Sequence, residues 1–284
     1  MLVDKPRGIT SFDVVAQVRR LIGVRRIGHT GTLDPMATGL LPICIGEATK
    51  LVPFLTEGNK SYEAVAKLGV TTDSGDADGK VIAEKDASHI AAVEIAGKLP
   101  RFVGAIDQIP PMHSAIRIGG KRLYELARAG QEIKRESRRV HVYSLTLLEF
   151  RNGHLRFSVE CSKGTYVRTL ATDVGEALGV GAHLTELRRT ASGLFRLIEA
   201  VALDRLSPPF RLVALADALS DMATVTVNAA QAKAVRDGKS EAVANLTPSG
   251  LDNGQKVRLL LDNGNLLAVA EMQLARLKLK RVFV

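Results

Sequence analysis

The chain has 284 residues, 46% hydrophobic and 24% charged, which is enough to bury the core of one large domain and a small one. Lysine and arginine number 39 against 30 acidic residues, and the formal net charge of +9 favours a polyanionic partner over an acidic small molecule. No apolar run approaches the roughly 20 residues of a membrane span, and the N-terminus lacks the apolar core of a signal peptide. We therefore expect a cytoplasmic protein without a membrane partner.

Basic residues recur in short runs along the whole chain, which favours a broad nucleic-acid surface over a single anion pocket. Aromatic residues make up only 4% and tryptophan is absent, so phosphate and shape contacts should outweigh stacking on exposed rings. The runs are Arg19-Arg20, Arg25-Arg26, Lys134-Arg135, Arg138-Arg139, Arg188-Arg189 and Lys278 to Arg281.

The N-terminal segment predicts a short strand and then a capped helix. Leu2 and Val3 form the strand. Thr10 with Asp13 three residues later is a capping pattern, and apolar residues then repeat at helical spacing as far as Gly23, where the helix should end.

The segment Gly28 to Gly39 isolates one carboxylate, Asp34, among small, hydroxyl-bearing and glycine residues. Pro35 biases Asp34 toward an extended backbone and so helps to fix the direction of its side chain. A turn in which Asp34 bonds its own backbone is the plain alternative. Because the segment lies between the basic pair Arg25-Arg26 and the apolar run 40–45, we favour an active site for an anionic polymer.

The middle of the chain alternates between strands and helices. Its apolar patterns predict a strand at Leu41 to Ile45, a helix at Ala48 to Leu55, strands at Tyr62 to Leu68, Val140 to Phe150 and Leu155 to Cys161, and a helix from Val167 that Gly179 ends. Between these elements, Pro110 to Arg139 combines glycines with many cations, which fits either a mobile arm or a solvated helical hairpin.

Two groups of residues invite a metal interpretation, and neither supports it. Residues 71–79 resemble a calcium loop, but with Gly79 at the sixth position Lys85 falls at the twelfth, where a glutamate is required. Cys44 and Cys161 are the only cysteines and lie in apolar, strand-like surroundings, which indicates buried thiols. We therefore expect a polar turn at 71–79, no metal and no cofactor.

From Ala223 onward the pattern changes to short alternating strands, after a Pro208-Pro209 break and a short predicted helix. The predicted strands are Val225 to Val227, Lys256 to Leu261 and Leu266 to Ala270, and the turn at 262–265 predicts a hairpin between the last two. Residues 1–222 should therefore form one domain and residues 223–284 a small β domain.

Three ordered motifs, supported by Leu184 to Thr190, resemble those of the TruB family of tRNA pseudouridine synthases. They are Lys5 to Gly8, Gly28 to Gly39, and Cys161 to Arg168, and the resemblance runs from Leu2 to the end. It implies an α+β fold, with a mixed, mainly antiparallel central sheet flanked by helices in a catalytic domain, residues 1–222. It also implies a thumb arm that binds RNA at 110–139 and a PUA-like RNA-binding domain at 223–284.

The implied activity is isomerisation of uridine 55 in the T-loop of tRNA to pseudouridine, through base flipping and cleavage and re-formation of the bond between ribose and base. No cofactor is implied. A monomer would act on tRNA without an obligate protein partner. Two other classes stay open: a glycosylase that removes a flipped base from RNA or DNA, and a tRNA chaperone without catalysis.

Three residues carry the implied chemistry. Asp34 would attack the sugar covalently or remove a ribose proton. Arg168 would hold Asp34 through two parallel hydrogen bonds of its guanidinium fork. Its place in the first helical turn opposes the helix dipole, which independently indicates an anionic partner. Tyr62 would stack on the target base and assist loss of the proton from its ring carbon.

The resemblance assigns further residues to substrate binding. His29 would fill the space left by the flipped base. Tyr166, Leu187, Lys50 and Asp76 match positions in the binding pocket, whereas Lys5 and Pro6 are expected to be structural.

Overall fold

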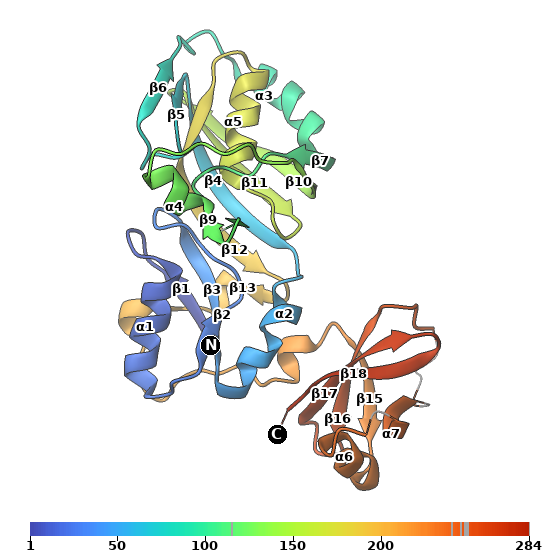
Figure 1. The fold of residues 1–284 in the computed structure, drawn as a ribbon. Coiled ribbons are helices and arrows are strands. Elements are labelled where there is room, and N and C mark those ends of the chain that lie inside the picture. Colours follow the sequence, from blue (N-terminus) through green and yellow to red (C-terminus); the bar gives the residue numbers. More distant parts are fainter. Residues whose placement is uncertain (115, 240, 245, 247–249, 284) are drawn as a thin grey trace.

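The computed structural model describes residues 1–114, 116–239, 241–244, 246 and 250–283. A large mixed sheet occupies the part of the chain before residue 203, and a four-stranded sheet forms near the C-terminus (Figure 1). The main path of the large sheet runs β14-β1-β3-β12-β4-β11-β10-β7, with β13 beside β12 and β2 beside β3. Most neighbouring strands are antiparallel, and the pairs β1–β14 and β12–β3 are parallel. The predicted α+β class is confirmed.

The large sheet has these bounds: β1 (Leu2–Lys5), β2 (Ile27–His29), β3 (Thr38–Ile45), β4 (Lys60–Leu68), β7 (Gly104–Gln108), β10 (Arg138–Arg151), β11 (His154–Cys161), β12 (Ala182–Ser192), β13 (Phe195–Arg196) and β14 (Val201–Ala202). The predicted strands at Tyr62 to Leu68, Val140 to Phe150 and Leu155 to Cys161 are confirmed, each with longer bounds. Cys44 and Cys161 are buried free thiols, as predicted.

Helices cover this sheet, and they are α1 (Ser11–Ile22), α3 (Ala92–Lys98) and α5 (Val167–Ala177). In Figure 1, α3 and α5 lie over the β4–β11–β10 part and α1 lies beside β1. The 3₁₀ turns are η1 (Gly46–Leu51), η2 (Leu99–Phe102), η3 (Leu197–Glu199), η4 (Leu203–Arg205) and η5 (Asp217–Leu219). No helix in the described ranges combines the length and the apolar character of a membrane span.

The capped helix α1 forms as predicted. Thr10 accepts a hydrogen bond from the Asp13 backbone, the Asp13 carboxylate accepts one from the Thr10 backbone, and Gly23 ends the helix in the left-handed conformation. The predicted helix at Ala48 to Leu55 is confirmed only in its second half, and its first half is a 3₁₀ turn. The chain forms η1 and then the short α2 (Val52–Leu55), because Pro53 lacks an amide hydrogen and fits only a first helical turn.

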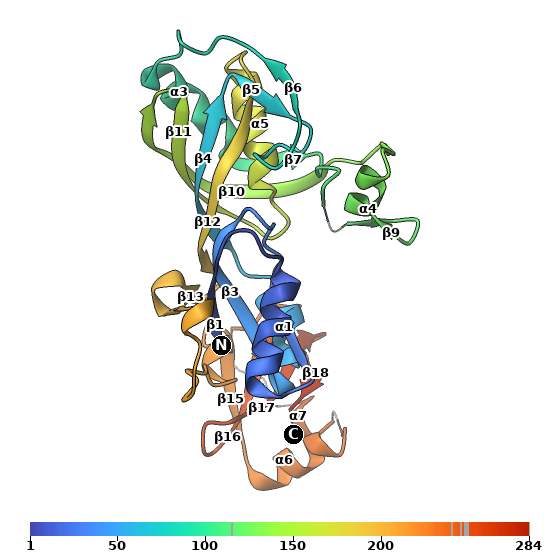
Figure 2. The same ribbon diagram turned by 90° about the vertical axis from the view of Figure 1, so that its left-hand side faces the viewer.

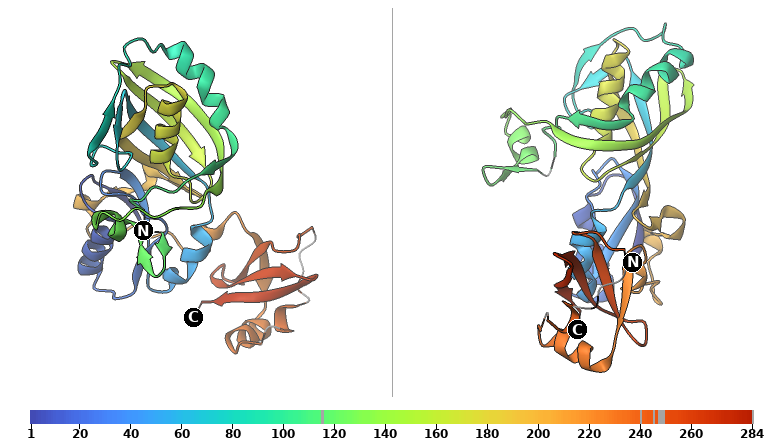
Figure 3. Two further views of the ribbon diagram at one scale, coloured as in Figure 1. Left: turned by 45° about the horizontal axis from the view of Figure 1, so that its top comes forward. Right: turned by 90° about the vertical axis from the view of Figure 1, so that its right-hand side faces the viewer.

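The arm leaves the sheet between β7 and β10 and stands clear of the body (Figure 2; Figure 3, right). It contains β8 (Arg117–Ile118), β9 (Lys121–Arg122) and α4 (Leu123–Arg128). A second hairpin, β5 (Val70–Thr72) with β6 (Val81–Glu84), encloses the polar turn predicted at 71–79.

The C-terminal sheet has the order β15-β16-β17-β18, with bounds β15 (Ala223–Val227), β16 (Lys256–Leu261), β17 (Leu266–Gln273) and β18 (Arg276–Val282). The predicted hairpin between β16 and β17 is confirmed. The structure also contains three elements that were not predicted: the helices α6 (Ala229–Arg236) and α7 (Glu241–Ala244) and the basic strand β18.

An apolar cluster joins the two sheets. Its buried members include Leu2, Leu40, Leu51, Phe195 and Leu219 on one side and Leu266, Val269 and Phe283 on the other. The C-terminal region is therefore packed against the rest of the chain.

Candidate active site

The carboxylate of Asp34 projects from the loop 30–37, between β2 and β3. Its neighbours Leu33 and Met36 are buried in the core, whereas 35% of the Asp34 side chain is exposed. Ser11 of α1 holds the backbone of Leu33 through two hydrogen bonds. Its hydroxyl accepts one from the Leu33 amide at 2.8 Å and donates one to the Leu33 carbonyl at 3.1 Å. The Asp34 carboxylate therefore projects between Leu33 and Met36, which are both anchored in the core.

Lys5 at the end of β1 holds the other side of this loop. Its fully buried ammonium group donates to the carbonyls of Pro6 (2.8 Å), Pro35 (3.3 Å) and Ala37 (2.7 Å). Burial lowers the pKa of Lys5 to about 8, and the negative charge of Asp34 acts in the opposite direction. These contacts fit the structural role predicted for Lys5.

Gly39 lets the strand β12 approach the end of the loop. Its φ of +98° belongs to the region that favours glycine, and a Cβ atom there would lie 2.4 Å from the Arg189 carbonyl oxygen. A larger residue would therefore push the loop away from β12.

Arg168 in the first turn of α5 connects two carboxylates. Its Nε lies 3.0 Å from Asp34 Oδ2 and its Nη1 lies 3.2 Å from Asp76 Oδ2. The remaining hydrogen bonds go to main-chain carbonyls, from Nη1 to Ser74 at 2.9 Å and from Nη2 to His113 at 2.7 Å. Only 3% of the Arg168 side chain is exposed.

The expected fork of two parallel hydrogen bonds from Arg168 to Asp34 is therefore wrong. One nitrogen serves Asp34 and another serves Asp76, because the turn 73–79 packs against the start of α5. Gly75 lies in this turn with a φ of +73°, in the region that favours glycine.

Asp76 is held by its own turn and is 7% exposed. Its Oδ1 accepts from the Ser74 hydroxyl at 2.5 Å and from the Asp78 amide at 3.2 Å, and its backbone forms a bridge to Leu184 of β12. The turn that resembles a calcium loop in sequence thus directs one carboxylate toward Arg168.

The pKa of Asp34 lies above its ordinary value because burial disfavours the charged form. The Arg168 guanidinium opposes this shift, the nearby Asp76 carboxylate adds to it, and the Lys5 ammonium opposes it. An ionised Asp34 therefore depends on Arg168.

Tyr62 on β4 lies directly opposite Arg189 on β12 in the strand register. Burial raises the pKa of the Tyr62 phenol, and Arg189 acts in the opposite direction. The hydroxyl therefore stays protonated near neutral pH.

His29 ends β2, at the start of the same loop. Burial, followed by the positive charge of Arg189, lowers its pKa, so the ring is neutral near pH 7. The Gly31 amide donates to His29 Nδ1 at 3.3 Å, which leaves the proton of the neutral ring on Nε2.

Tyr166 and Leu187 lie on the elements that carry this group. Tyr166 precedes α5, where the buried Gln108 side chain accepts from its amide at 3.0 Å and donates to its carbonyl at 3.3 Å. Burial raises the pKa of the Tyr166 phenol. Leu187 lies opposite Ala64, two residues along from the Tyr62–Arg189 pair and on the same face of the sheet.

The structure does not place the Lys50 side chain beside Asp34 and Arg168. Its Nζ donates to the Val282 carbonyl at 2.9 Å, pairs with Glu47 at 2.5 Å and lies 5.8 Å from the centre of the Phe283 ring. Lys50 thus joins η1 to the C-terminal region.

Arg189 and Gln108 are residues of this site that the sequence analysis did not single out. The expectation that Arg188-Arg189 is part of the basic surface is wrong for Arg189, which is 1% exposed, while 44% of the Arg188 side chain is exposed. The two-residue alternation from Leu187 along a strand was the signal that could have shown Arg189 to point inward.

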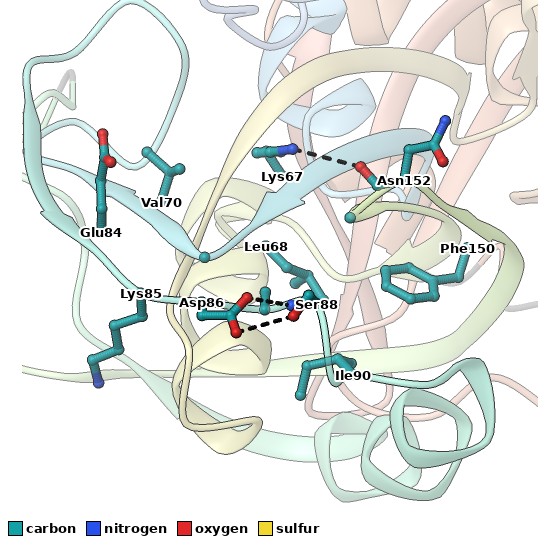
Figure 4. Close-up of a pocket in the computed structure, with 13 residues that line it drawn as sticks. Lys67, Leu68, Val70, Glu84, Lys85, Asp86, Ser88, Ile90, Phe150 and Asn152 are labelled. Carbon is teal, nitrogen blue, oxygen red and sulfur yellow. Dashed lines mark hydrogen bonds between the residues drawn. The ribbon is translucent and has the colours of Figure 1, made fainter.

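A separate hollow of about 710 Å³ lies at the far end of β4 (Figure 4). Lys67, Lys85, Asp86 and Phe150 are among its lining residues, and the Asp86 carboxylate accepts hydrogen bonds from Ser88. None of the predicted site residues lines it, so we place the chemistry at Asp34.

The model of the TruB family pseudouridylate synthase N-terminal domain matches residues 19–167, and that of the tRNA pseudouridylate synthase B C-terminal domain matches residues 168–222. A tRNA pseudouridine synthase B of Symbiobacterium thermophilum is 52% identical over 243 residues, covering 84% of this chain and 81% of that protein. The tRNA pseudouridine synthase B of Clostridium perfringens is 40% identical, and the match covers 99% of this chain and 97% of that protein. That of an Azoarcus species is 46% identical, and the match covers 99% of this chain and 93% of that protein.

Several solved structures match the whole chain, and two of them illustrate the likeness. One is a crystal structure of a Cbf5-Nop10-Gar1 complex, with a TM-score of 0.77, 27% identity and coverage of 84% of that chain. The other is an H/ACA RNP bound to a substrate RNA containing 2′-deoxyuridine, with a TM-score of 0.76, 25% identity and coverage of 84% of that chain.

Proposed function

The chain belongs to the TruB family of pseudouridylate synthases, and on this premise we propose that it isomerises uridine 55 in the T-loop of tRNA to pseudouridine. It is an isomerase that forms pseudouridine in tRNA, as the named relatives support. The observation that carries the assignment to this site is the contact between Arg168 Nε and Asp34 Oδ2, at 3.0 Å. It places a partly exposed carboxylate at the end of a buried ion network.

The reaction exchanges one bond for another. The bond from C1′ of the ribose to N1 breaks, the base turns, and C5 bonds to C1′; C5 then loses its proton and N1 gains one. Asp34 acts on the ribose, either as a nucleophile or as the base that removes a ribose proton. Both routes require an ionised carboxylate, which is the form that Arg168 stabilises.

The remaining residues hold the flipped nucleotide. Tyr62 stacks on the base and assists loss of the C5 proton. The neutral His29 fills the space that the flipped base leaves in the loop. Tyr166 and Leu187 line the pocket, and Asp76 keeps the guanidinium of Arg168 directed at Asp34, supported by its 3.2 Å contact.

The affinity for tRNA comes from surfaces outside this group. We propose that the arm at 110–139 closes on the T stem-loop, and that residues 223–284 form a PUA-like domain that binds RNA, with residues 1–222 as the catalytic domain. The protein acts as a cytoplasmic monomer without an obligate protein partner.

The test is release of tritium from C5 of uridine in an unmodified tRNA. We expect release with wild-type protein, an unchanged intact mass of unlabelled RNA, and no release from a tRNA with cytidine at position 55. An abasic site and a lower RNA mass would instead identify a glycosylase. Binding without either product would identify a chaperone.

A further inference from the structure

Arg189 carries a buried positive charge that pairs with no carboxylate in the part of the chain that the structure describes. Its side chain is 1% exposed. Its Nε donates to the Leu40 carbonyl at 2.7 Å and its Nη2 to the Gly31 carbonyl at 3.1 Å, and both acceptors are neutral. Within the described ranges, Arg189 forms no ion pair with an aspartate or glutamate, whereas Arg168 contacts two.

A buried charge without a counter-ion is costly, so its presence in this site calls for an explanation. Its hydrogen bonds to β3 and to the loop could be made by a neutral donor. An anion that forms only during the reaction would supply the missing partner.

Arg189 lies on the side of the site that receives the base. It is directly opposite Tyr62, at a position where Cβ atoms are typically about 4.5 to 5.5 Å apart and project from one face of the sheet. It also binds Gly31, two residues after His29. The pKa values of Tyr62 and His29 both respond to its charge. Asp34, by contrast, is paired with Arg168.

The chemistry of the proposed function creates a suitable anion, and the inference rests on that function. When the bond from C1′ to N1 breaks, its electron pair stays on N1 and the base leaves as the uracil anion. The anion persists until C5 bonds to C1′. A fixed cation in a site of low dielectric constant stabilises such a charge without reorganising.

We propose that Arg189 is a positioning residue that stabilises the negative charge on the detached base, acting through its electric field from the position beside Tyr62. The site then uses two buried arginines for two purposes. Arg168 serves the carboxylate that acts on the ribose, and Arg189 serves the base as it leaves.

The experiment compares single-turnover rates on tRNA carrying uridine or 5-fluorouridine at the target position. Both rates are measured as disappearance of the starting nucleoside in chromatography of the digested RNA, because 5-fluorouridine has no C5 proton to lose and its rearranged product keeps the fluorine on C5. Fluorine withdraws electrons and stabilises the detached base, so it should replace part of what Arg189 supplies. We expect Arg189→Met to lose on the order of a hundredfold with uridine, the size typical of one lost electrostatic contact, and at least several-fold less with 5-fluorouridine.

Two further variants separate charge from architecture. Arg189→Lys keeps the charge without the guanidinium fork and should recover most of the uridine rate. Arg188→Met removes the same charge from the next residue, which pairs with Asp4 at 2.7 Å. Any loss in Arg188→Met should be equal for both substrates. Melting curves and tRNA affinity show which variants are folded.

Equal losses on the two substrates for Arg189→Met would overturn the proposal and leave Arg189 as a support of the loop. If Arg189→Met does not fold, Arg189→Lys decides: a large loss of equal size on both substrates has the same meaning. Failure of the wild-type protein to convert uridine would instead overturn the proposed function, so the two failures are distinguishable.

Discussion

Arg168 joins Asp34 and Asp76 through different nitrogens of one guanidinium, Nε to Asp34 at 3.0 Å and Nη1 to Asp76 at 3.2 Å. The charge of Asp76 contributes to the raised pKa of Asp34, while the charge of Arg168 opposes that rise. The active carboxylate is therefore one end of a network of three groups, and each group has its own expected effect on the reaction.

Replacement of Asp34 by asparagine should abolish turnover while tRNA affinity changes little. In the proposed mechanism the side chain acts on the ribose, whereas most affinity comes from phosphate contacts elsewhere. Tritium release and filter binding on the same preparation provide the two measurements. Continued release by Asp34→Asn would remove Asp34 from the chemistry.

Replacement of Arg168 should lower turnover in a fixed order, with alanine worse than lysine. Removing one partner of a buried pair costs about 3 to 5 kcal/mol, and solvent at Asp34 screens part of this, so we expect roughly a hundredfold to a thousandfold loss for Arg168→Ala. Lysine restores the charge but cannot reach both carboxylates with a planar fork. Near-normal single-turnover rates for Arg168→Ala would show that the pair has no role in catalysis.

The same variants should change the pH dependence in a defined direction. Asp34 acts as a carboxylate, so activity falls as the pH drops through its pKa. Without Arg168 that pKa rises further, and the acid limb of the rate profile should move to higher pH. If the acid limb stays at the same pH while the rate falls, the variant has lost the geometry of the site and not changed the pKa of Asp34.

Asp76→Asn should move the acid limb the other way. The change removes a negative charge that raises the pKa of Asp34, so the limb should move to lower pH. The rate itself should fall, because Arg168 loses one of its anchors. Asp78→Asn is the matched control, since Asp78 is an exposed carboxylate in the same turn. Equal behaviour of the two variants would contradict the network.

Lys50→Met should leave the single-turnover rate at saturating tRNA nearly unchanged. Lys50 contacts the Val282 carbonyl and lies over the Phe283 ring, so its loss should loosen the C-terminal region and weaken tRNA binding. Binding titrations and rates at saturation separate the two effects. A large drop in the rate at saturating tRNA would instead show that Lys50 acts in the substrate pocket.

Local signals in the sequence predicted much of this molecule. The Thr10–Asp13 cap, the Gly23 stop and the alternation of Tyr62 to Leu68 each depend on neighbouring residues, and each element forms as expected. The loop around Asp34 was recognisable because a lone carboxylate lies among small residues beside an apolar strand.

The rest depends on contacts between distant segments. Leu184 to Thr190 carries a glutamate and two arginines, and it becomes a central strand only because β3 and β4 pair with it. The divided contacts of Arg168 require the turn at 73–79 to pack against α5, roughly ninety residues later in the sequence. The burial of Arg189 requires this segment to be a strand between β3 and β4, and only then does the two-residue alternation from Leu187 turn Arg189 inward.

The hydrogen bond from Arg168 Nη2 to the His113 carbonyl, at 2.7 Å, links the arm to the guanidinium that contacts Asp34. His113 lies where the chain passes from the end of β7 into the arm. A displacement at this root must either stretch that bond or carry the guanidinium with it, and the same guanidinium holds Asp34. Under the proposed function, changes at the tip of the arm alter only how tightly RNA is held, whereas changes at its root also alter the surroundings of Asp34.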